Sequence, residues 1–297
     1  MRQTLALLVL VVSLACSCAS PATRDWGAIA RADYAVPADA DPFELALELT
    51  ELLGSRDPKL RDDYAFGITA NWLTRQKLFT EDELRELARR WTANLERGIG
   101  SRYDDSVLVR SFSALSLSAL VSRELQSPFL RADEVHALLE IALDYSARER
   151  DLRDWDPELG WIHAVAHTAD LLKFLARHPH VDRARLTRIL GAVEQRVTTP
   201  MPRAFSMGED ERLVRAAAAV LVRADHDPQE FDAFLERLVE ARVRARDATP
   251  FAPENVAVEQ NVLHFLRALH SGLAAIDGLP EHVVRGRDAA LRALARA

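Results

Sequence analysis

The chain has 297 residues, 48% of them hydrophobic, and a formal net charge of −7 at pH 7. This is enough apolar material for one large core or two modest ones. Its lysines and arginines are scattered among acidic residues. Because phosphate binding needs a basic surface, this pattern excludes nucleic acid as an expected partner.

The first 18 residues are predicted to be an export signal. Arg2 is the only charged residue before Arg24, and residues 4–15 are almost wholly apolar. This run is too short to cross a hydrocarbon core of about 30 Å, which favours a signal segment over a transmembrane helix.

The end of this signal resembles the lipobox of bacterial lipoproteins, in which a cysteine follows a small residue. Cys18 is slightly favoured for acylation, and Cys16 is the alternative. We therefore expect an exported bacterial lipoprotein, anchored to a membrane at the periplasmic face or the cell surface. A plain secreted protein, cleaved near Ala19 or Ala22, is the other interpretation. No cysteine follows Cys18, so the body is expected to have neither a disulfide nor a cysteine metal site.

The rest of the chain divides into a tether and a helical body. Residues 19–41 are rich in Ala, Pro and Asp and are interpreted as a tether between anchor and body. Residues 42–297 are predicted to form a single all-helical domain, because Leu, Ala, Arg and Glu dominate and apolar residues recur at three- and four-residue spacing. Asp-Pro pairs that begin at positions 41, 57, 156 and 227 offer helix N-caps.

These signals predict about eleven consecutive helices with mostly short connections. Short connections make neighbouring helices antiparallel, and such a series favours an irregular α/α superhelix of the HEAT or armadillo type, with sites on its concave side. The expected helices span residues 42–54, 58–76, 80–97, 106–123, 132–148, 158–177, 182–198, 209–224, 228–246, 254–275 and 280–296.

The helix expected over 106–123 contains an arginine among small and apolar residues. Arg110 in this setting is expected either to pair with an acid, for which Asp170 is one candidate, or to extend its charged end to solvent from the helix edge.

The sharpest polar pattern lies in the helix expected over 158–177. His163, His167 and Asp170 stand at i, i+4 and i+7, within an arc of about 60° on one helix face. Two imidazoles and a carboxylate at this spacing could bind a divalent metal such as zinc. The alternative is a solvated face of an amphipathic helix. Trp161, just before them, is a further candidate ligand-binding residue.

Two later segments offer more candidate site residues. In the acidic first turn of the helix expected from residue 209, capping accounts for Glu209 and leaves Asp210 and Arg212 as site candidates. The helix expected over 254–275 carries a one-sided polar stripe beside Asn261. Its ligand-binding candidates are Asn261, His264 and Arg267.

Several of these segments together resemble the bacterial domain of unknown function 2785 family. The resemblance spans roughly residues 42–273, and its most specific part is residues 161–170. Thr168 stands where the family often has glycine. The export signal is a second departure, because the resemblance implies a cytoplasmic location for many relatives. The resemblance implies an all-helical fold and brings no established activity. The segments that carry it are residues 54–62 (GSRDPKLRD), 110–115 (RSFSAL), 160–172 (GWIHAVAHTADLL), 208–213 (GEDERL) and 261–269.

Two classes of function remain open from the sequence. The first is a non-catalytic scaffold, anchored to a membrane, that binds an unknown protein or small-molecule ligand on its concave face. The second is a metal-dependent hydrolase that uses His163, His167 and Asp170. The sequence has no Gly-rich phosphate loop, no nucleophile elbow, no paired Ser/His or Cys/His motif and no His-Glu-x-x-His pattern, so the scaffold is favoured.

Overall fold

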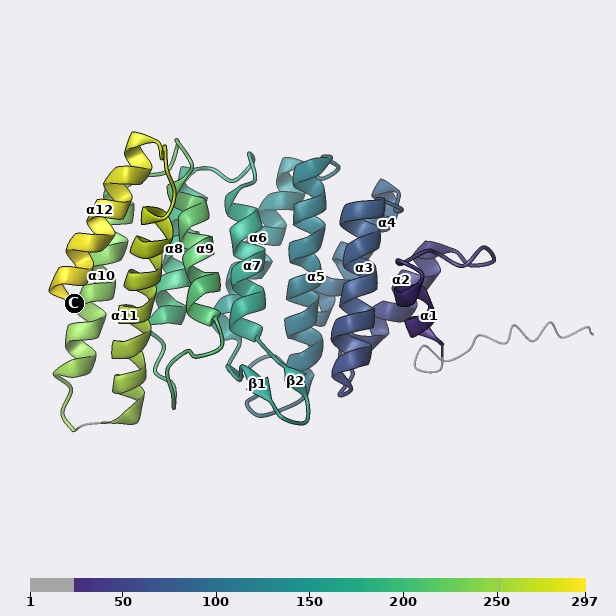
Figure 1. The fold of residues 1–297 in the computed structure, drawn as a ribbon, viewed down its shortest axis with the longest axis horizontal. Helices are drawn as coiled ribbons and strands as arrows, with labels where there is room; N and C mark the ends of the chain where they lie inside the picture. The colour runs from purple at the N-terminus through teal and green to yellow at the C-terminus, as the bar shows by residue number, and fades with distance from the viewer. Residues whose placement is uncertain (1–23, 251) are drawn as a thin grey trace, which may run out of the picture.

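The computed structural model describes residues 24–250 and 252–297, and the predicted signal with Cys16 and Cys18 lies outside the described residues. The described chain is almost entirely helical, with one two-stranded hairpin (Figure 1). Its elements are α1 (Trp26–Arg31), α2 (Pro42–Leu52), η2 (Lys59–Phe66), α3 (Gly67–Asn71), η3 (Trp72–Gln76), α4 (Glu81–Asn94), α5 (Ser106–Gln126), α6 (Ala132–Arg148), β1 (Trp155–Asp156), β2 (Gly160–Trp161), α7 (Ala164–Ala176), α8 (Arg183–Val197), α9 (Glu209–Leu221), α10 (Pro228–Arg246), α11 (Pro253–Ala274) and α12 (Glu281–Arg296).

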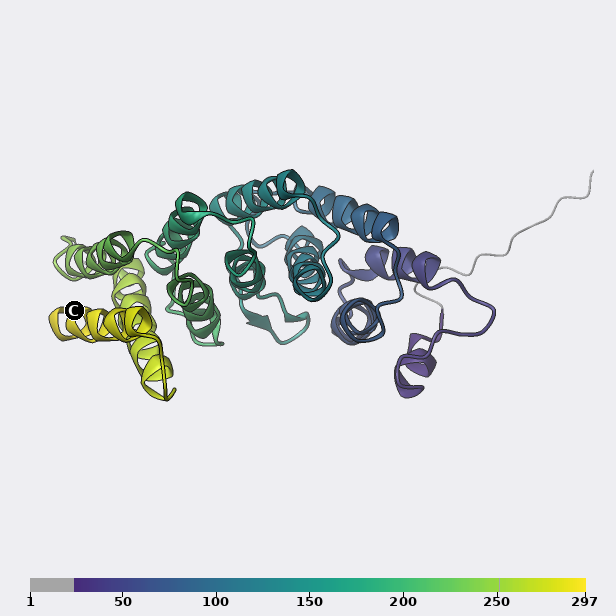
Figure 2. The ribbon, with the colours of Figure 1, turned by 90° about the horizontal axis from the view of Figure 1, so that it is seen from above.

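The helices form two rows that follow a shallow arc (Figure 2). Helices α4, α6, α8 and α10 lie on the outer side of the arc. Helices α3, α5, α7, α9 and α11 lie on the inner, concave side, where α5 packs on α7 and α7 on α9. The predicted all-α class is confirmed. Assignment of this array to the HEAT or armadillo type stays a prediction.

Capping residues explain where many of the helices begin. The carboxylates of Asp41 and Asp227 accept hydrogen bonds from the first-turn N–H groups of α2 and α10, each of which has proline at its start. Thr80 and Glu83 form a reciprocal capping box at α4. The helix predicted over 58–76 is present as the continuous run η2, α3 and η3, whose two ends have wide turns.

Helix α5 is the centre of the array, because 15 of its 21 residues are buried. Its serines and alanines are small enough for α7 to pack closely against it. A buried hydroxyl needs a partner, and Ser116 Oγ donates to the carbonyl of Phe112 at 2.8 Å within the helix itself. The largest fully buried side chains of the core include Trp26, Trp72, Trp91, Phe112, Phe234 and Phe265.

Part of the predicted tether is folded. Helix α1 lies within residues 19–41, and its Trp26 is fully buried. The indole N–H of Trp72 donates to the backbone carbonyl of Tyr34 at 2.7 Å, which fixes the segment after α1 against the body. The isolated aromatic residues of this segment are therefore anchors for packing.

No helix in residues 24–250 and 252–297 combines the length and the apolar character that a bilayer span requires.

Candidate functional site

A short hairpin replaces the start of the helix that the sequence predicted over 158–177. Strands β1 and β2 pair antiparallel, with Trp155 opposite Trp161. Asp156, predicted to be a helix N-cap, instead accepts hydrogen bonds of 2.8 and 3.0 Å from two backbone N–H groups of the hairpin turn. Helix α7 begins only at Ala164. The Asp-Pro pair at 156 therefore caps a turn, because Asx turns and helix N-caps use the same side-chain bond.

His163 consequently stands outside the helix, at the N-cap position of α7. Its φ of 50° is in the left-handed region, which non-glycine residues seldom adopt. The N–H groups of Ile162 and His163 both donate to the carbonyl of Asp154, at 2.8 and 3.2 Å, and hold this backbone in place. The predicted helical stacking of His163 over His167 is therefore absent. The two rings meet edge to face, with centroids 5.8 Å apart.

A buried arginine holds the hairpin against the array. Arg61 donates to the carbonyls of Leu159 and Trp161 on the hairpin, and to that of Ser55 at 2.6 Å. Its guanidinium lies 4.8 Å from the ring centroid of Phe112 on α5. Burial lowers the pKa of Arg61. Backbone carbonyls, the aromatic face and nearby carboxylates together compensate the buried cation.

His163 is fixed by contacts on both sides of its ring. Trp161 stacks on it, with centroids 4.3 Å apart. Nε2 lies 3.2 Å from the carbonyl of Met207, and because a carbonyl can only accept, Nε2 carries the hydrogen. The same Nε2 is 3.7 Å from Glu209 Oε1. Burial lowers the pKa of His163, so the neutral imidazole is the form present at pH 7.

His167 is also a neutral, hydrogen-bonded histidine. Its Nδ1 is 2.8 Å from the hydroxyl of Ser111 on α5. That hydroxyl donates its single hydrogen to the carbonyl of Ile162, so Nδ1 of His167 is the donor in the Ser111 contact. Desolvation lowers the pKa of His167 well below its ordinary value. Ser111 is therefore not an activated nucleophile, because His167 does not accept its proton.

Asp170 is separated from the histidines by its own ion pairs. It contacts Lys173 Nζ at 2.8 Å and the guanidinium of Arg212 on α9. A carboxylate held by two cations is a structural group that ties α7 to α9. Within the described ranges, no group of three or more His, Cys, Asp or Glu side chains is arranged to hold a metal ion.

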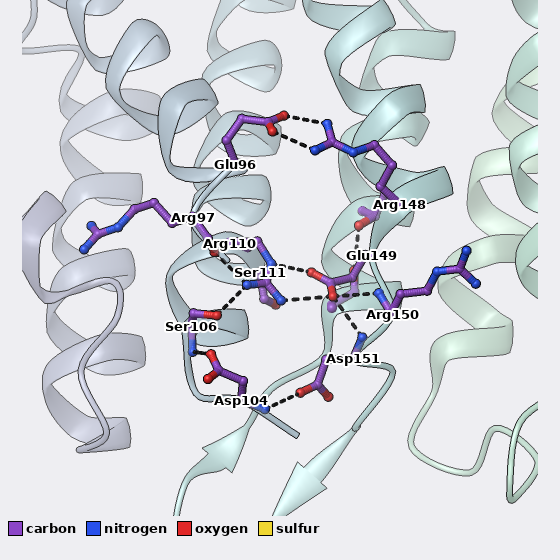
Figure 3. Close-up of polar contacts among 12 residues, drawn as sticks. Glu96, Arg97, Asp104, Ser106, Arg110, Ser111, Arg148, Glu149, Arg150 and Asp151 are labelled. Atoms are coloured by element: carbon purple, nitrogen blue, oxygen red, sulfur yellow. Dashed lines mark hydrogen bonds and ion pairs between the residues drawn. The ribbon is translucent and has the colours of Figure 1, made fainter. Parts of the chain in front are cut away.

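Arg110 is buried and paired, but its partner is Glu149, and the suggested pairing with Asp170 is wrong. Two charge-assisted hydrogen bonds join the guanidinium to the carboxylate, at 2.6 and 3.0 Å (Figure 3). Arg110 also donates to the carbonyl of Arg97 and to the hydroxyl of Ser106, both at 2.7 Å. The pair joins α5 to the end of α6 and makes no contact with the His163 site.

The remaining candidates lie on helices beside α7. Asn261, fully buried on α11, accepts a hydrogen bond from the N–H of Phe205 at 2.7 Å, so its role is to hold the loop before α9. His264 is half-buried and Arg267 is exposed on the same helix, and Asp210 is half-buried in the first turn of α9. Helix α9 lies between α7 and α11 in the inner row (Figure 2). Arg212 is thus the candidate on these helices that directly contacts the predicted set of His163, His167 and Asp170, through its ion pair with Asp170.

Sequence reasoning missed three residues that build the site. Arg61 and Ser111 lie within segments that carried the family resemblance, but their partners are distant in the chain. Glu209, interpreted as a helix cap, is buried and is the carboxylate nearest His163. Its Oε2 accepts from the N–H of Met207 at 3.0 Å, while its Oε1 has no hydrogen-bond partner among the described residues. Burial raises the pKa of Glu209.

These features define an all-α protein with a curved array of helices and a rigid, hydrogen-bonded site around a hairpin on the inner row. The chain belongs to a family described as protein of unknown function (DUF2785), whose sequence profile matches residues 95–270. The match begins later than residue 42, where the sequence placed the resemblance, and it includes the hairpin, α7 and most of α11. No curated protein and no solved structure matches the chain.

Proposed function

We propose that this protein is a membrane-anchored, non-catalytic scaffold that binds a partner protein through exposed apolar side chains on its hairpin and on the loop before α9. The observation that carries this proposal is the hairpin patch, defined here as Trp155, Trp161 and Met207. Their exposed fractions are 44%, 39% and 42%. Trp155 and Trp161 are directly opposed across the hairpin, so both project from the same face. Exposed tryptophans on a rigid support are typical centres of protein interfaces.

The rigidity of the patch supports binding over catalysis. Arg61 fixes the hairpin backbone, and His163 stacks under Trp161, so little side-chain freedom is lost when a partner binds. Two of the groups that a hydrolase could use, Ser111 and Asp170, are already engaged. His167 donates to Ser111, and Asp170 is paired with Lys173 and Arg212. Ser111 is therefore not a nucleophile activated by His167, and Asp170 is held as a structural carboxylate that joins α7 to α9.

Site-specific photo-crosslinking in cells tests the binding surface. A photoreactive residue at position 155 is expected to give a discrete crosslinked product, and Trp161→Ala is expected to weaken it. The matched control position is Leu291 on α12, which has a similar exposed fraction of 47%. Absence of a product at 155, or the same products at 155 and 291, would refute the proposal.

The membrane anchor is proposed from the signal segment alone. Replacing both Cys16 and Cys18 by Ser should abolish labelling with a radioactive fatty acid and move the protein from the membrane to the soluble fraction. Substitution of each cysteine singly identifies which of the two is acylated. Retention of full labelling in the double variant would show that acylation does not occur at these cysteines.

A further inference from the structure

A cavity lies where helices α6 and α8 end, apart from the hairpin patch. Its volume is about 350 Å³, within the range of small-molecule sites. Three stretches of chain line it: residues 102–103 before α5, residues 147–153 at and after the end of α6, and residues 195–203 at and after the end of α8. The cavity is thus formed by neighbouring loops at one edge of the array.

The lining is strongly cationic in a protein whose net charge is negative. Five of its residues are arginines, and only two, Glu149 and Asp151, are acids. Both acids are already engaged. Glu149 is held by two hydrogen bonds from Arg110, and Asp151 pairs with Arg153 at 2.7 Å. The lining arginines are Arg102, Arg150, Arg153, Arg196 and Arg203.

Arg196 is the most informative of these arginines because it is buried. Its exposed fraction is 6%, and its guanidinium donates a hydrogen bond to the backbone carbonyl of Glu149 at 3.1 Å. The cost of removing an arginine from water is large unless an anion compensates it. The carboxylate of Glu149 acts on Arg196 but already binds Arg110, and Arg196 has no ion pair within residues 24–250 and 252–297.

Arg150 is a second lining arginine whose guanidinium has no ion pair in the described part of the chain. Its side chain extends away from Glu149, with no polar contact at its charged end (Figure 3). Neither Arg150 nor Arg102 has a side-chain ion pair within residues 24–250 and 252–297. Burial lowers the pKa of Arg196, and the nearby charge of Arg150 acts in the same direction. Glu149 is the acid beside both arginines and its carboxylate is already bound by Arg110, so a bound anion would stabilise both guanidinium groups.

Apart from Gln195 and Thr199, the rest of the lining is mostly apolar. Leu152, Met201 and Pro200 contribute carbon surface, and Tyr103 adds an aromatic ring. The cavity therefore has a cationic part that suits planar or tetrahedral oxyanions and a carbon-lined part that suits a compact hydrophobic group.

We propose that this cavity is a binding site for a small organic anion, namely a phosphate monoester or carboxylate attached to a compact apolar group, with Arg196 and Arg150 as its principal ligands. The site goes beyond the hairpin patch proposed above and does not depend on it. A volume of about 350 Å³ accommodates one ring with its anionic substituent and excludes a lipid with two acyl chains.

Isothermal titration of the full chain with phenyl phosphate and with benzoate tests this site. We expect binding at one site per chain and none for the neutral analogue benzyl alcohol. Arg150→Gln should weaken binding by about ten-fold, the value of one charge-assisted contact, and Arg150→Gln/Arg196→Met should bring it below detection. Trp155→Ala should leave it unchanged, which separates this site from the hairpin patch.

The matched control is Arg97→Gln, which removes an exposed arginine from the neighbouring loop before α5 and spares the cavity. Equal weakening by Arg97→Gln would reveal non-specific charge attraction and overturn the proposal. Failure of the wild type to bind either anion would overturn it too. Tight binding to phosphatidylglycerol vesicles, lost in Arg150→Gln, with no binding of phenyl phosphate, would overturn the soluble-ligand assignment. Because Arg196→Met removes a buried cation, its unfolding midpoint should not fall, which keeps loss of binding distinct from loss of fold.

Discussion

The Arg110–Glu149 pair gives the sharpest test of what holds the array together. Its side chains are 0% and 3% exposed, so the two hydrogen bonds between them are shielded from solvent. Glu149→Ala would leave the guanidinium of Arg110 buried with only the carbonyl of Arg97 and the hydroxyl of Ser106 as partners. Breaking a buried pair in this way costs about 3–5 kcal/mol of unfolding free energy. That corresponds to a fall in Tm of roughly 6–20 °C at about 2–4 °C per kcal/mol.

Urea unfolding followed by circular dichroism measures this cost, and the surface offers a matched control. Glu140 pairs with Arg188 between α6 and α8, but these side chains are 50% and 49% exposed. Glu140→Ala should therefore cost about 1 kcal/mol or less. The double variant Arg110→Met/Glu149→Met, which removes both charges, should be more stable than Glu149→Ala. A Glu149→Ala variant no less stable than Glu140→Ala would refute the reasoning.

Three further outcomes are expected from the site. Burial depresses the pKa of His167, so the unfolded chain binds the additional proton, and stability should fall as the pH drops below about 6.5. His167→Gln should flatten this dependence of the urea midpoint, and an unchanged slope would contradict the assignment. A Cβ on Gly160 would lie 2.9 Å from Pro58 Cβ, whereas one on Gly208 would meet no atom within 4 Å. Since both glycines have positive φ, Gly208→Ala should lower the unfolding free energy by about 1–2 kcal/mol. Gly160→Ala should lower it clearly more, because its Cβ would also collide with Pro58. Equal unfolding midpoints for the two variants would disprove this close approach. Elemental analysis of the purified chain should find no stoichiometric zinc. Zinc that is present in the wild type and lost in His163→Ala would instead support the metal-dependent hydrolase.

The helices could be predicted from the sequence because their signals are local. Asp41, Thr80 and Asp227 cap helices at the positions that their own neighbours indicate, and the three- and four-residue apolar spacing marks each buried face. The hairpin could not be predicted in the same way. Its strands have two residues each, and Asp156 followed by proline fits a turn as well as a helix start.

The partners of the buried charges could not be predicted from the sequence for a different reason. Arg110 and Glu149 are 39 residues apart, and His167 and Ser111 are 56 apart, so only the packing of helices brings them together. Glu149 looks like one more acid at a solvated helix end, and Glu209 like a cap. A single sequence gives the residue type at each position, while the pairing of a charge depends on the tertiary contacts around it.

The contact of Arg61 with the hairpin has a consequence for folding cooperativity. In arrays where each unit touches only the next, ends can unravel one unit at a time while the rest persists. Arg61 departs from that rule, since it binds carbonyls 98 and 100 residues further along the chain. Melting of the N-terminal helices would thus leave the hairpin carbonyls without their donor and loosen the middle of the molecule in the same event. A fragment confined to residues 95–270, the extent of the family match, lacks this link and should unfold in a broader, less concerted transition than the whole chain.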